Sequence, residues 1–88
     1  MKYRSRTDIV ADILESANGA NVTKTKIMYK AFLSFAQLQE YVSLLLQNSL
    51  LEYHSHNQSY RTTEKGMHFL KMYQHIDHYI ANPAKAKV

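Results

Sequence analysis

Several residue types that carry chemistry are missing from this chain or rare in it. It has no cysteine, one proline and two glycines among 88 residues. Disulfides, thiolate zinc sites and thiol nucleophiles are therefore excluded, which suits an intracellular protein. The sequence also has no phosphate-cradling glycine loop, no nucleophile elbow and no paired-carboxylate arrangement. We therefore expect a protein that is not an enzyme and that uses no cofactor.

Long apolar runs are missing as well. The longest, such as Leu44–Leu46, have three residues, whereas a membrane-spanning helix needs roughly 20. The first residues also lack the apolar core of a signal peptide. A chain of this length forms one domain. We expect a soluble, cytoplasmic protein without a membrane partner.

Basic residues exceed acidic ones, and their distribution is uneven. The formal net charge is +4, which favours an anionic partner. Residues 32–60 contain no lysine or arginine. Six of the eleven basic residues lie in the first third of the chain: Lys2, Arg4, Arg6, Lys24, Lys26 and Lys30. A helix within residues 32–60 would therefore be uncharged or slightly acidic.

Apolar residues recur at helical spacing in the first half of the chain. The first helix can be capped within residues 5–8 and should end at Asn18-Gly19 in left-handed geometry. After a short extended link at residues 20–22, Thr23 can cap the second helix. Only residues 31–33 separate this helix from the next.

The third helix has the clearest start. Ser34 and Gln37 form a capping box, in which each side chain accepts a hydrogen bond from the other residue's backbone N–H. Two helices joined by so short a link indicate a helix-turn-helix. The helix over residues 34–48 would then be the recognition helix. Asn48 is expected to take the left-handed conformation at its end.

Strand-like and helical patterns follow. Residues 50–54 and 59–63 read as two strands, and the four polar residues between them as a hairpin loop. Thr63 can cap a last helix that continues to Ala81, before Asn82-Pro83 stops it. Residues 82–88 are expected to be a disordered tail.

The last helix carries more apolar surface than a domain of this size can cover. Its broader apolar stripe consists of Phe69, Met72, Tyr73, Ile76, Tyr79 and Ile80. We expect the stripe to pair with its counterpart as a two-helix coil in a homodimer, in either parallel or antiparallel orientation. Packing on the first helix of the same chain is the alternative.

These segments resemble a known family, the small archaeal winged-helix DNA-binding proteins that dimerise through a C-terminal helix as an antiparallel coiled coil. The resemblance covers nearly the whole chain, and its most specific part is Thr63-Glu64-Lys65-Gly66. It rests further on residues 8–14, 23–31, 38, 41–45 and 60–66.

The resemblance implies a mainly α fold with a small β-hairpin. Residues 1–63 would form the winged helix-turn-helix and residues 64–81 the dimerisation helix. It also implies non-enzymatic binding of double-stranded DNA, by a transcriptional regulator or a nucleoid-associated factor. Its recognition helix would enter the major groove.

Roles follow for individual side chains. The basic residues expected at phosphates are Arg4, Arg6, Lys24, Lys26, Lys30 and Arg61. The uncharged residues expected near base edges are Ser34, Gln37, Gln39 and Ser43. A glutamine can pair with adenine, and Tyr29 or Phe35 could touch DNA sugars at the turn. A solvated helix face is the alternative for each lysine.

Five histidines are present, but their spacing does not form a convincing set of ligands and we expect no metal. Protonation of His54 and His56 in mildly acidic solution would add positive charge to the wing and strengthen DNA binding. Among permanent cations the wing has only Arg61. A winged helix that binds a protein instead of DNA is therefore the alternative function, and the acidic Glu40 would allow it.

Overall fold

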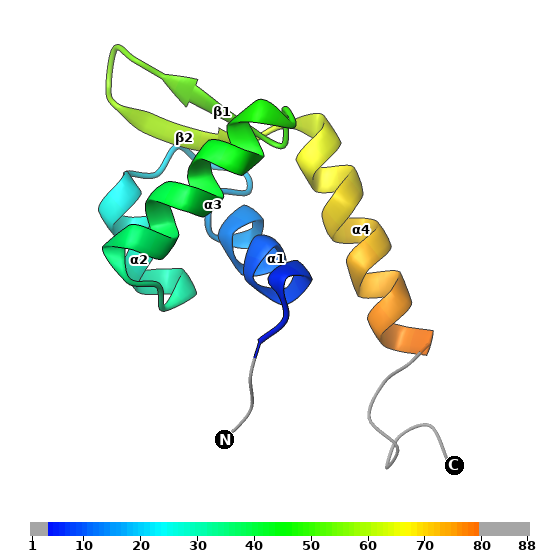
Figure 1. The fold of residues 1–88 in the computed structure, drawn as a ribbon. Helices are drawn as coiled ribbons and strands as arrows, with labels where there is room; N and C mark the ends of the chain where they lie inside the picture. Colours follow the sequence, from blue (N-terminus) through cyan, green and yellow to red (C-terminus); the bar gives the residue numbers. More distant parts are fainter. Residues whose placement is uncertain (1–3, 80–88) are drawn as a thin grey trace.

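The protein was analysed as a computed structural model, which describes residues 4–79. In this part of the chain, four helices and one antiparallel hairpin follow one another (Figure 1). Their bounds are α1 Arg6–Ser16, α2 Lys24–Ala31, α3 Phe35–Gln47, β1 Leu51–His54, β2 Ser59–Thr62 and α4 Glu64–Tyr79. The predicted mainly helical fold with a small hairpin is confirmed.

The helix starts are local features, and the structure confirms them. Ser34 Oγ accepts from the Gln37 backbone N–H at 3.2 Å, and Gln37 Oε1 accepts from the Ser34 N–H at 3.1 Å. Ser5 begins α1 with a second capping box, and Thr23 and Thr63 cap α2 and α4 with their hydroxyl groups. Each such cap typically contributes about 1 kcal/mol.

The end of α3 differs from the prediction. Asn48 is not left-handed: its φ is −94°, and Ser49 has the positive φ of 60°. The Asn48 N–H still donates to Leu44 O at 3.1 Å, so helical bonding continues through Asn48. The Leu50 N–H then closes the end on Leu45 O at 2.9 Å. This is a Schellman motif whose left-handed position falls on Ser49.

The core lies where the first three helices meet the hairpin. Its largest fully buried side chains are Ile13, Leu14, Ile27, Leu38 and Leu45. The predicted extended link also joins the sheet, because Val22 and Tyr60 exchange backbone hydrogen bonds of 2.9 and 2.7 Å. The link therefore fixes the start of α2 against strand β2.

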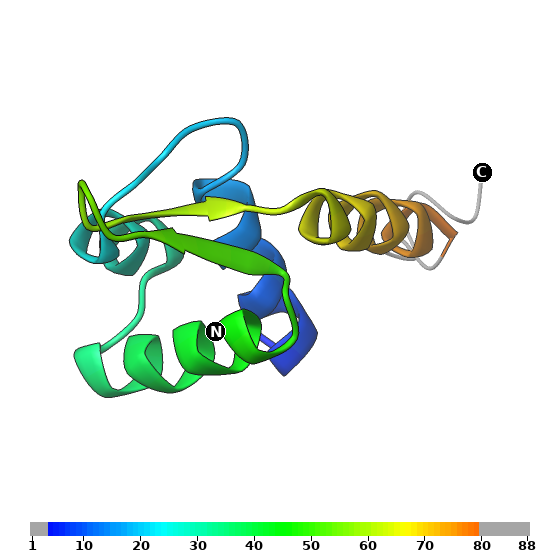
Figure 2. The ribbon, with the colours of Figure 1, turned by 90° about the horizontal axis from the view of Figure 1, so that it is seen from above.

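Helix α4 leaves the hairpin and extends to one side of the other helices (Figure 2). Leu70 is buried in the core, and Phe69 and Tyr73 are partly buried against it. Met72 and Ile76 remain 62% and 52% exposed. Packing within the chain thus covers part of the apolar stripe. The Tyr79 side chain and Ile80, which complete that stripe, lie outside the described residues, as do residues 82–88.

Candidate nucleic-acid interface

Helix α3 lies at one edge of the domain (Figure 2). Its inward residues are Leu38, Tyr41, Val42 and Leu45. Phe35, Gln39 and Ser43, which follow one another at intervals of four residues, are exposed. Residues at this spacing are neighbours along one side of a helix. They form a continuous line, which we call the reading row.

The start of α2 lies beside the reading row. Lys24 Nζ donates to Gln39 Oε1 at 2.7 Å. A polar hollow of about 340 Å³ lies next to Lys24, between the first turn of α2 and the hairpin. Its lining residues are Thr23, Lys24, Thr25, Tyr53, Asn57, Gln58 and Tyr60. A cation therefore borders an uncharged part of α3.

Two glutamines expected to contact bases already use their carbonyl oxygens within the chain. Gln37 Oε1 accepts from Ser34 in the capping box, and Gln39 Oε1 accepts from Lys24. A bidentate contact between glutamine and adenine needs both the oxygen and the amide NH₂ group. Such a contact would therefore need the second lone pair of an oxygen that is already bonded, whereas a single donor contact from the NH₂ group would not involve the oxygen.

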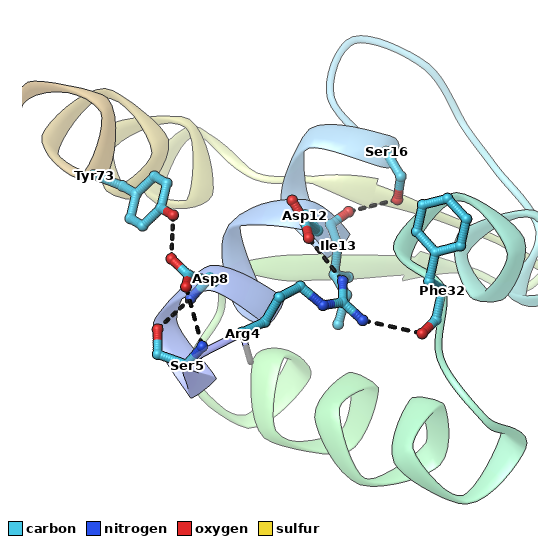
Figure 3. Close-up of polar contacts among 8 residues, drawn as sticks. All are labelled: Arg4, Ser5, Asp8, Asp12, Ile13, Ser16, Phe32 and Tyr73. Carbon is cyan, nitrogen blue, oxygen red and sulfur yellow. Dashed lines mark hydrogen bonds and ion pairs between the residues drawn. The ribbon is translucent and has the colours of Figure 1, made fainter. Parts of the chain in front are cut away.

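The two N-terminal arginines make contacts within the chain. Arg4 Nη1 pairs with Asp12 Oδ2 at 2.8 Å, and its Nη2 donates to Phe32 O at 3.0 Å (Figure 3). Arg6 lies over the Tyr41 ring, 5.6 Å from its centroid. Arg4 thus connects α1 to the turn before α3, and Arg6 connects α1 to α3 itself.

The lysines of α2 have different surroundings. Lys24 borders the reading row, and Lys26 is exposed in the first turn. Lys30, near the end of the helix, lines a hollow together with Asp12, Glu15 and Ser16 of α1. Two acidic residues thus share the hollow with Lys30, and one of them, Asp12, also pairs with Arg4. The three lysines, which the sequence presents as one group, therefore do not form one surface.

The hairpin carries little net charge. Arg61 pairs in register with Glu52, and Glu52 Oε2 lies 2.9 Å from His54 Nε2. His56 is exposed in the loop, with its ring 6.0 Å from that of His54. Among the side chains that the structure describes, those of residues 4–76, no three from His, Asp or Glu come together as a metal site would require.

A second surface lies between α1 and α4. An apolar groove of about 350 Å³ is lined by Ser5, Thr7, Asp8, Phe69, Met72, Tyr73 and Ile76. The Tyr73 hydroxyl donates to Asp8 Oδ1 beside this groove (Figure 3). This bond, together with the hydrogen bonds from Ser5, holds the pKa of the Asp8 carboxyl below its ordinary value.

The order of the elements, a helix-turn-helix followed by a hairpin and a last helix, agrees with a family model described as winged helix-turn-helix, which matches residues 3–81. The chain belongs to the winged helix-turn-helix family. In this winged helix, α3 holds the position of the recognition helix and β1–β2 form the wing.

A solved structure shares the same fold. It is that of Sso10a-2, described as a DNA-binding protein from Sulfolobus solfataricus, with a TM-score of 0.82 and 24% sequence identity. The match covers 96% of this chain and 90% of the Sulfolobus chain. A search of curated proteins finds no match. Among the described residues, no helix is long and apolar enough to cross a membrane.

Sequence reasoning missed two features of the winged helix that involve contacts between helices. One is the hollow that Lys30 shares with two acidic residues of α1, and the other is the bond of Arg4 to the turn. Basic residues do concentrate early in the chain. Their spacing, however, does not show which of them face α1.

Proposed function

We propose that this protein is a non-enzymatic double-stranded DNA-binding protein that places α3 in the major groove. The observation that carries the proposal is the exposed, uncharged reading row with Lys24 at its side. Winged-helix membership and the DNA-binding description of Sso10a-2 support it. A transcriptional regulator and a nucleoid-associated factor would both use this surface.

We assign phosphate contacts first to Lys24 and Lys26, which lie in the first turn of α2. The hollow beside Lys24 is open and polar, so a DNA backbone could approach it. Arg61 would contribute less, because Glu52 lies opposite it. Lys30 would also contribute less, since two acidic residues of α1 line the same hollow. Arg4 and Arg6 would act chiefly by holding α1 against the turn and α3.

Base contacts fall to the exposed side of α3. Gln39 and Ser43 lie in the reading row, and Gln37 retains its amide NH₂ group as a donor beside Ser34. His56, at the wing tip, would approach the backbone. The helix can therefore offer donors to base edges while the lysines hold the phosphates.

We further propose that the protein is a homodimer in which α4 of a second copy covers the apolar groove. The exposed Met72 and Ile76 support this proposal, because they continue the apolar lining of the groove along α4. A twofold dimer would present two copies of α3 to DNA. Sedimentation at micromolar concentration tests it, and a monomer there would contradict it.

The experiment for DNA binding is fluorescence anisotropy of a labelled random-sequence duplex at about 50 and 200 mM salt. We expect binding that weakens strongly at the higher salt, since released counterions drive phosphate contacts. The alternative function, a winged helix that binds a protein, predicts DNA binding that is absent or insensitive to salt. Either of those results would contradict the proposal.

A further inference from the structure

The recognition helix lacks the residues that most often identify a base pair. Arginine and lysine make the commonest specific contact, to guanine, but residues 32–60 contain neither. The first turn of α3 instead presents an aromatic ring: Phe35 is 62% exposed, and the neighbouring Ala36 is exposed as well. The helix therefore lacks the commonest partner of guanine, whereas it offers an apolar surface that an apolar group on a base would fit.

The fold itself does not need the Phe35 ring. Its neighbours Leu33 and Leu38 are buried, at 7% and 1% exposure, and they anchor both sides of the helix start. The capping box of Ser34 and Gln37 fixes the first turn without help from Phe35. An exposed phenylalanine that contributes little to the core is available for contact with another molecule.

The position of Phe35 indicates which molecule this is. It begins the reading row, one turn before Gln39, and Gln39 Oε1 lies 2.7 Å from Lys24 Nζ. The Phe35 ring thus lies in the same row as Gln39, and Gln39 contacts Lys24, the lysine that we assign to a phosphate. In the major groove, thymine alone among the four bases carries a methyl group, and phenylalanine is one of the side chains that contact it.

The polar groups nearby agree with this assignment. Because the Gln37 and Gln39 oxygens are engaged within the chain, the two side chains offer NH₂ donors. Adenine N7 and thymine O4 are both acceptors, and guanine N7 and O6 are acceptors as well. These donors therefore fit either base pair, and the methyl group of thymine is the feature by which the first half of α3 can distinguish them.

We infer that Phe35 contacts the 5-methyl group of thymine, so that α3 selects A·T pairs beneath its first turn. This inference rests on the proposed function. Removing one methyl group from water is worth about 0.8 kcal/mol, which corresponds to about fourfold in affinity. We expect that ratio for each methyl group that a Phe35 ring covers.

The test compares two duplexes that have the same A·T sequence and length, one with thymine and one with deoxyuridine, which lacks only the methyl group. Anisotropy titrations should show the wild-type protein binding the thymine duplex about fourfold more tightly per contacted methyl. In Phe35→Ala the two duplexes should bind equally. Phe35→Leu, which keeps an apolar side chain, should retain part of the preference.

Phe32→Ala is the matched control. Phe32 is an exposed phenylalanine directly after α2, 83% accessible, and removal of its ring should leave the thymine preference unchanged. Circular dichroism would verify that each variant is folded. Equal binding of both duplexes by the wild-type protein would overturn the inference, as would a thymine preference that survives in Phe35→Ala. Failure of the wild-type protein to bind either duplex would instead overturn the proposed function, and the inference with it.

Discussion

Lys24 and Lys30 lie on the same helix and carry the same charge, so their replacement by alanine is a controlled comparison. The structure predicts unequal effects on DNA binding. Lys24 borders the reading row, whereas Lys30 lines a hollow with Asp12 and Glu15. We expect Lys24→Ala to weaken binding to all duplex sequences and Lys30→Ala to leave it nearly unchanged.

The magnitude follows from counterion release. Each phosphate contact contributes about 0.9 to the slope of log affinity against log salt concentration. Over a fourfold change in salt, from about 50 to 200 mM, one contact therefore accounts for about 3.5-fold in affinity. Lys24→Ala should flatten the slope by about 0.9 for each DNA-binding head, and Lys30→Ala should not change it.

The assay is the anisotropy titration at four or more salt concentrations, with thermal unfolding as a check on folding. Both lysines are at the surface, so each replacement should change stability by less than about 0.5 kcal/mol. An equal decrease of the salt slope in the two variants would refute the assignment of different roles to Lys24 and Lys30. An unchanged slope in Lys24→Ala would remove that residue from the interface.

Three further predictions concern the fold and the dimer. Asp8 has a lowered pKa, chiefly because Tyr73 donates a hydrogen bond to it. The Asp8 carboxylate therefore stabilises the fold fully above the pKa of the unfolded aspartate, and this stabilisation is lost as pH falls through the pKa of Asp8 in the folded protein. In Asp8→Asn, urea unfolding should therefore show a smaller loss of stability on acidification, and an unchanged pH profile would contradict this. Gly66→Ala should destabilise the fold by about 1–3 kcal/mol in thermal unfolding, because a Cβ there would lie 2.4 Å from Leu50 O; wild-type stability would show that α4 can shift. Ile76→Glu should convert the proposed dimer to monomers in sedimentation velocity, since a buried, unpaired carboxylate is costly, while an unchanged sedimentation coefficient would exclude Ile76 from the interface.

Features set by neighbouring residues could be predicted from the sequence. The caps at Ser34 and Thr63 depend on residues within three positions, and both are present in the structure. The left-handed position after α3 is predicted one residue early, at Asn48 instead of Ser49, because either residue can follow a helix. The choice between them depends on the Leu50–Leu45 closure.

Features that depend on long-range packing could not be predicted. The Val22–Tyr60 pairing joins residues 38 positions apart, and no local pattern indicates it. The surroundings of Lys30 depend on how α1 crosses α2. For the candidate site, the types of side chain could therefore be predicted from the sequence, whereas the residues that lie next to each of them could not.

The close approach of Gly66 to the hairpin has a consequence for distances on DNA. With a carbonyl oxygen so near the glycine backbone, the first turn of α4 has little freedom to tilt relative to the wing. In the proposed dimer, α4 would then act as a stiff arm that is fixed to the DNA-binding head at one angle. The distance between the two heads would then be fixed by the geometry of the α4 pair, so the dimer would bind two half-sites only at one spacing.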